Sequence, residues 1–366
     1  MAPRRRQTAE SAVATLLHLP PEICALICAV VEPKTLFALA RVSRTFRDEA
    51  QRLIFQSVDL RDSGKALAGW CRAVSRNARL GGYVRRFTIS SREVVAGSDD
   101  PARVARALKK CTGLQRLATW VIDHVSFRLT HFSNSHFRFA FLRQFFNRQT
   151  DIRVLSLPMM PVGLLDGAFP CSDDQLPKLI ALEVPSTDLL PTEPRPLQRI
   201  QLRLTHQYIP RDLTRLQLFA ATLTSLSISE VAVISLEETF AAIAQAVPHL
   251  QHLALTENLV PYFDESDEQF RRTEVQPAPR AALPRLRQLK TLVLYPLLEP
   301  ERVAELFLEI APGLKTVTIG AYAGSPRWRL VAAETTCTLT RGEGSAAHTV
   351  KIGNGYDFNA VSQFWD

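Results

Sequence analysis

The sequence predicts a mixed α/β protein in which short parallel strands alternate with helical segments along the chain. Two observations support this prediction: an apolar-x-x-apolar-x-apolar triplet recurs nine times between residues 84 and 319, and helix-like or proline-marked segments separate the triplets. The last two apolar positions of each triplet are two residues apart, which places both side chains on one face of a strand. Repetition of a strand and a helix is expected to stack the strands side by side in a curved α/β solenoid.

The triplets begin at irregular intervals, and one of them extends into a longer pattern. Residues 250–260 fit L-x-x-L-x-L-x-x-N-x-L with a valine at the last position, whereas the other segments keep only the first half and Thr119 interrupts even that. This pattern resembles leucine-rich repeats, whose units are about 20–29 residues long. The resemblance implies an irregular leucine-rich-repeat-like solenoid over residues 59–322. The nine triplets begin at Val84, Leu114, Ile152, Leu179, Leu197, Leu223, Leu250, Leu289 and Leu314.

Start signals predict the helices that lie between these strands. Ser235 and Glu238 form a capping box at the head of an amphipathic stripe. A capping aspartate followed by a proline opens a helix over 102–110, and single prolines precede the helices expected over 213–221 and 301–310. Each of these segments is therefore expected to cover the strand next to it.

The first 60 residues have a different pattern, which predicts three short helices. Three short helices in about 45 residues cannot bury all of their apolar groups among themselves. Part of this apolar surface is therefore expected to need a partner. The apolar positions are Ile23, Leu26, Ile27 and Val30 in the first helix, Leu36, Leu39 and Val42 in the second, and Phe46, Ala50, Leu53 and Ile54 in the third, which Ser43 caps.

The order of residues in this segment resembles an F-box over residues 16–58. The resemblance rests on Leu19-Pro20-x-Glu22-Ile23, followed by Val42-Ser43-Arg44-x-Phe46, and on Val58-Asp-Leu60, which resembles the strand that often follows an F-box. The linker at residues 32–35 is short for the family. An F-box joined to irregular leucine-rich repeats is similar to the substrate receptors of SCF-type E3 ubiquitin ligases, especially the divergent fungal ones.

The resemblance implies recruitment and no catalysis. The F-box would bind a Skp-family adaptor, which joins a cullin and a RING subunit, and the repeats would hold an unidentified target protein. The alternative is a leucine-rich-repeat scaffold without a ligase, in which the N-terminal helices only cap the solenoid. The residues that the resemblance places against the adaptor are Leu19, Pro20, Ile23, Ile27, Leu36, Leu39, Val42 and Phe46.

Polar positions of the predicted strands are the candidates for binding the target. Several are basic, which indicates an acidic or phosphorylated target segment. The chain carries a formal net charge of +8, with 36 arginines and 8 lysines. A nucleic-acid-binding protein is a further hypothesis. The arginines are spread along the chain, with only Arg4–Arg6 in a run of three, which argues against it. The candidate target-binding residues are Arg116, Arg153, Arg199, Arg203 and His252.

Composition and missing motifs exclude several other classes. No apolar run approaches the roughly 20 residues that cross a bilayer, and we expect neither a secretion signal nor a membrane partner. The six cysteines are dispersed, so we expect no disulfide framework, no metal site and no cofactor, with Cys24 and Cys28 as small buried hydrophobes. We expect a protein of the cytoplasm or nucleus, with a disordered basic segment at 1–15 and a strand-rich cap at 323–366.

Overall fold

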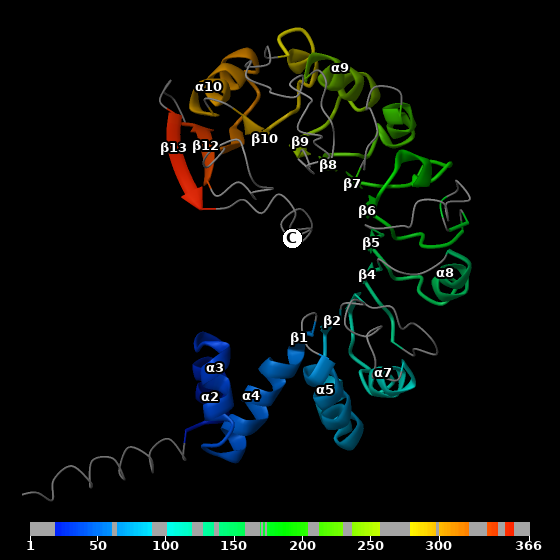
Figure 1. Cartoon of the computed structure of the whole chain (residues 1–366), viewed down its shortest axis with the longest axis vertical. Coiled ribbons are helices and arrows are strands. Elements are labelled where there is room, and N and C mark those ends of the chain that lie inside the picture. Colours follow the sequence, from blue (N-terminus) through cyan, green and yellow to red (C-terminus); the bar gives the residue numbers. More distant parts are fainter. Residues whose placement is uncertain are drawn as a thin grey trace, which may run out of the picture. The chain divides into compact units, whose positions relative to one another are not determined.

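The structure is a computed structural model of the chain, which divides into two compact units, Met1–Phe137 and Arg138–Asp366 (Figure 1). The basic segment expected at 1–15 lies outside the described residues. The units are described in turn. The structure describes residues 19–60, 64–89, 101–118, 127–134, 139–157, 169, 171–172, 174–203, 212–229, 236–256, 279–297, 300–321, 335–342 and 348–354.

The first unit begins with the three short helices that the sequence predicts: α2 (Pro21–Val30), α3 (Pro33–Leu39) and α4 (Arg44–Gln56). A proline occupies the first turn of both α2 and α3, where its missing N–H leaves no helical hydrogen bond unmade. The backbone N–H of Phe46 donates to the side chain of Ser43 at 3.2 Å, so Ser43 caps α4 as expected.

The rest of the first unit is a parallel sheet with helices on its connections. The residues Val58, Phe87, Leu117 and Phe132 pair across the four strands in register, and all are buried. Trp70 stacks on Phe87 with the ring centroids 4.4 Å apart. The elements are β1 (Ser57–Asp59), α5 (Gly64–Arg76), α6 (Ala78–Tyr83), β2 (Arg86–Thr88), α7 (Pro101–Leu108), β3 (Arg116–Ala118) and β4 (His131–Ser133).

The second unit continues the alternation of parallel strands and helices. Each strand from β5 to β10 pairs in parallel with the one that follows it along the chain. In this unit α8, α9 and α10 lie on the outer side of the strands (Figure 1). The elements are α8 (Phe139–Phe146), β5 (Val154–Ser156), β6 (Ala181–Val184), η1 (Thr187–Leu189), β7 (Arg199–Arg203), η2 (Asp212–Phe219), β8 (Ser225–Ser229), α9 (Leu236–Ala246), β9 (His252–Thr256), η4 (Leu283–Arg285), β10 (Thr291–Leu297), α10 (Pro300–Ile310) and β11 (Thr316–Ala321).

An antiparallel hairpin ends the sheet of the second unit. It consists of β12 (Thr335–Arg341) and β13 (His348–Asn354), and β12 pairs with β11 along six residue pairs. The hairpin occupies the edge that β11 would otherwise present to solvent. Within the described residues, no helix is both long enough and apolar enough to span a membrane.

The recurring triplets confirm the predicted fold class, a mixed α/β protein with a mostly parallel sheet. Every described triplet residue is at most 7% exposed, and the last two positions fall in or beside a strand. Some elements differ from the prediction, among them η2 and β4. The helix expected over 213–221 is the 3₁₀ helix η2, and β4 was not predicted because Asn134 takes the third apolar position after Leu129 and Phe132. Asn134 is nonetheless 4% exposed.

Candidate functional site

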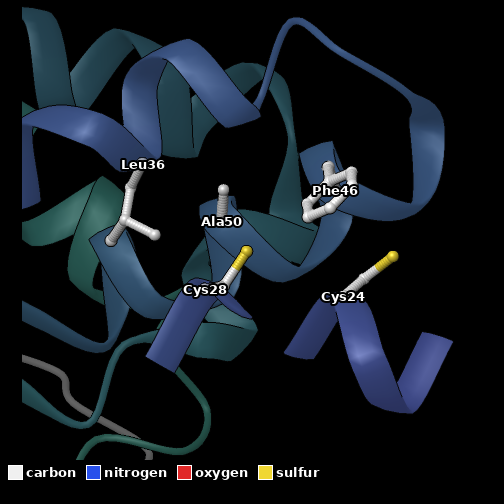
Figure 2. Packing of buried hydrophobic residues seen from close by; sticks show 5 residues of the cluster. All are labelled: Cys24, Cys28, Leu36, Phe46 and Ala50. Atoms are coloured by element: carbon white, nitrogen blue, oxygen red, sulfur yellow. The ribbon is translucent and has the colours of Figure 1, made fainter. Parts of the chain in front are cut away.

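The three N-terminal helices pack around a small core of their own. Figure 2 shows its five buried side chains, two from α2, one from α3 and two from α4. Cys24 and Cys28, each 1% exposed, form the buried face of α2, as the sequence analysis expected of them. Leu36, Phe46 and Ala50 complete the core. The large aliphatic side chains of α2 therefore do not provide its main buried face.

The other side of α2 and the adjoining α3 expose large apolar side chains to solvent. Ile23, Leu26 and Val30 of α2 are 41%, 63% and 83% exposed, and their spacing of three and four residues places them on one helix face. Phe37 of α3 is 60% exposed, and Val42, which follows α3, is 38% exposed. These five residues are called the N-terminal apolar surface. Among the described residues, only Leu218 is a further exposed large hydrophobic side chain.

The residues expected at an adaptor interface divide between this surface and the core beneath it. Pro20, Ile23 and Val42 are exposed, whereas Leu36 and Phe46 are buried in the helical core. Three more, at positions 19, 27 and 39, are half-buried and pack against that core. Their role at an interface stays a prediction.

Sequence reasoning did not assign Leu26, Val30 and Phe37 to the interface, although they are the most exposed apolar side chains of the segment. It did place Leu26 and Val30 on an apolar face of the first helix. The sequence does contain a signal for them, because the first helix carries apolar residues on more than one face. Small cysteines can fill the buried face, which leaves the larger apolar side chains exposed.

The motif residues have clear structural roles in shaping these helices. The carbonyl of Pro20 accepts hydrogen bonds from the N–H groups of Ile23 and Cys24, both at 3.1 Å, and thereby starts α2. Arg47 donates through Nε to the carbonyl oxygen of Ala40 at 3.3 Å, across the turn that Ser43 closes. The Leu-Pro and Val-Ser-Arg-x-Phe segments therefore set where α2 and α4 begin.

Two ion pairs involve charged residues of α4. Arg52 and Glu49 form a hydrogen-bonded ion pair, which lowers the pKa of the Glu49 carboxyl. Burial raises the pKa of the Cys28 thiol, and the Glu49 charge adds to this effect. An ion pair between Asp48 and Arg79 joins α4 to α6. These contacts hold α4 within the first unit.

The structure brings together some of the predicted target-binding residues. Arg199 and His252 lie in the same cross-strand row of the second unit, with Ser225 between them. Burial lowers the pKa of His252, and the positive charges of Lys290 and Arg199 lower it further. Sequence reasoning missed Lys290, because it precedes β10 by one residue and its approach to His252 depends on strand register.

The remaining predicted residues are spread over the two units. Arg116 is on β3 in the first unit, Arg153 is an exposed residue just before β5, and Arg203 ends β7. The strand register described here pairs none of these three residues with Arg199 or His252.

Much of the polar face of the second unit is buried as well. One row across β6 to β9 consists of Glu183, Gln201, Ser227 and Ala254, all at most 7% exposed. Ser156 donates a hydrogen bond of 2.5 Å to the Glu183 carboxylate. The more accessible positions of these strands are therefore at their beginnings, where His252 is exposed and Arg199 half-buried.

Metal-ligating side chains and thiols are the other groups that could support a site. The described part of the chain contains no group of three or more His, Cys, Asp or Glu side chains that could hold a metal ion. All six cysteines are buried thiols. The chain matches no protein-family model and no curated protein sequence.

Proposed function

We propose that the chain is a substrate-recognition subunit of an SCF-type E3 ubiquitin ligase, with α2 to α4 as an F-box and the strands that follow as a leucine-rich-repeat-like solenoid. The F-box would bind a Skp-family adaptor, and the solenoid would hold a target protein. The observation that carries this proposal is the N-terminal apolar surface, because it lies within the segment that resembles an F-box.

The exposure of this surface favours a protein partner. Leu26, Val30 and Phe37 are each at least 60% exposed, and such side chains release roughly 1.5–3 kcal/mol each when they are fully buried. Several large apolar side chains exposed on two successive helices are typical of a docking surface. An adaptor that covered it would tether the target near a charged E2 and thereby raise its effective concentration.

Co-expression with a Skp-family adaptor, followed by size-exclusion chromatography, tests the proposal. The wild-type chain should elute as a stoichiometric complex. Leu26→Ala combined with Phe37→Ala should weaken the complex by roughly 100-fold or more, because two exposed anchors are lost at about 2 kcal/mol each. Both side chains lie outside the helical core, so the variant should retain its thermal midpoint. Leu218→Ala, an exposed apolar residue of the second unit, is the matched control.

A second candidate function is a scaffold in which the same helices only cap the solenoid. The Asp48–Arg79 ion pair supports a capping role, since it fastens α4 to α6 within the first unit. A soluble monomer that does not bind the adaptor would favour the scaffold function. If the double variant bound the adaptor as tightly as the wild type does, the N-terminal apolar surface would not be part of the interface. The ligase proposal would then lose its main support.

A further inference from the structure

The largest excess of positive charge lies in one stretch of the first unit. Residues 64–134 contain 13 Lys and Arg against four Asp and Glu, a formal charge of +9 in a chain whose total is +8. The arginines are spread along the chain, but acidic residues are scarce in this stretch. All four of its acidic residues lie outside the described residues. Such segregation of charge indicates a surface that meets an anionic partner.

Strand register brings two of these arginines and a histidine into one row. Arg86 on β2 pairs with Arg116 on β3, and Arg116 pairs with His131 on β4. The next residue on each strand is buried: Phe87 on β2, Leu117 on β3 and Phe132 on β4. Because side chains alternate along a strand, the three basic residues face the opposite way, and they are exposed or half-buried. They are called the basic strand row.

Neighbouring strands are about 4.8 Å apart, which places two guanidinium groups and one imidazole over a span of roughly 10 Å. Carboxylate or phosphate groups bound along the row would accept charge-assisted hydrogen bonds from the two guanidinium groups. Thr88 and Ser133 lie two residues further along β2 and β4 and add hydroxyl groups to the same face.

We propose that the basic strand row binds an acidic segment of a partner protein through side-chain carboxylate or phosphate groups. A protein segment suits the row better than a nucleic acid does. Single-stranded nucleic acids are bound with aromatic platforms on which bases stack. The outward positions of β2, β3 and β4, namely residues 86, 88, 116, 118, 131 and 133, include no Phe, Tyr or Trp. That the segment belongs to a ubiquitylation target rests on the proposed function, whereas the binding itself does not.

Fluorescence anisotropy with the full chain, without adaptor, tests this proposal. The probes are a labelled Glu-rich peptide, the same peptide with phosphoserine in place of glutamate, a Gln-substituted peptide and a uridine-rich RNA. Arg86→Gln combined with Arg116→Gln should weaken binding of at least one acidic peptide by about tenfold or more. The comparison of Glu-rich and phosphoserine peptides shows which oxyanion is preferred.

A matched variant distinguishes an effect of the basic strand row from an effect of lower net charge. Arg72→Gln combined with Arg76→Gln removes the same charge from exposed positions of α5, and it should weaken binding by less than about threefold. Arg86→Lys combined with Arg116→Lys keeps the charge and should retain most of the binding, which guards against misfolding of the Gln pair. Equal losses in both Gln pairs, tighter binding of RNA than of any acidic peptide, or no peptide binding would each overturn the proposal.

The adaptor experiment distinguishes this proposal from the proposed function. The Arg86→Gln and Arg116→Gln pair leaves the N-terminal apolar surface intact, so its complex with the adaptor should be that of the wild type. Loss of peptide binding with an intact adaptor complex supports the row. If the chain bound the peptide but not the adaptor, the ligase proposal would be contradicted and the proposal for the basic strand row would be supported.

Discussion

Small side chains decide which face of α2 is buried. Cys24 and Cys28 face Ala50 of α4 in the helical core, and the small volume of all three lets the helices approach closely. Ile23 and Leu26 remain on the accessible side, although they are the more hydrophobic residues. A close helix pair thus leaves larger apolar groups available to a partner.

Cys111 provides a residue-scale prediction about pH. Burial raises the pKa of its thiol from 9.0 to about 12. Because the folded state holds this proton more tightly than the unfolded state, the associated stability is fully present below pH 9 and is lost as the pH rises toward 12. Urea titrations at about pH 8 and pH 10.5 should show the wild type losing roughly 2 kcal/mol more than Cys111→Ala. Parallel losses in the two proteins would contradict this.

At the scale of elements, alternation of apolar and polar residues located most of the strands. The triplets predicted nine strands because an inward-facing pair two residues apart occurs in each. The strand β4 was not predicted, because Asn134 is buried where the triplet pattern requires an apolar residue. The helices α5 and α6, which precede the first triplet strand, were not predicted either. The type of η2 depended on how tightly its turns pack, which residue spacing does not reveal.

Helix α6 provides a prediction at the element scale, because it contains two glycines in different surroundings. A Cβ atom on Gly81 would lie 2.6 Å from the backbone carbonyl oxygen of Lys110, whereas one on Gly82 would meet nothing within 4 Å. Gly81→Ala should therefore lower the free energy of unfolding by roughly 1–3 kcal/mol. Gly82→Ala should be neutral or stabilise by up to about 1 kcal/mol, since alanine favours the helix.

Chemical denaturation of the two glycine variants under the same conditions checks this contrast. The slopes of the two transitions should match that of the wild type, so that the midpoints report stability alone. Equal midpoints for Gly81→Ala and Gly82→Ala would mean that α6 and the chain after α7 are not in the close contact described.

At the scale of the whole molecule, a stack of parallel strands needs a protected end. The β12–β13 hairpin pairs with β11 and closes the sheet of the second unit. A chain that ends at Ala321 would leave unpaired the N–H and C=O groups of β11 that face β12, and we expect it to aggregate or to form oligomers. A chain that ends at Asn354 keeps both strands of the hairpin and is the matched control.

Light scattering coupled to size-exclusion chromatography measures this outcome directly. The shorter chain should lose the monomer peak that the longer chain retains. A monomeric shorter chain with an unchanged thermal midpoint would show that the hairpin does not protect the sheet.

The amino-acid sequence by itself determined the mixed α/β class, the positions of most strands and the three N-terminal helices, because each depends on local spacing, prolines and caps. It also contained the charge imbalance of residues 64–134. Only the tertiary structure decided that Leu26 and Phe37 are exposed, and that Arg86 lies beside Arg116. Those facts depend on helix packing and strand register, which join residues far apart in the chain and have no local signature.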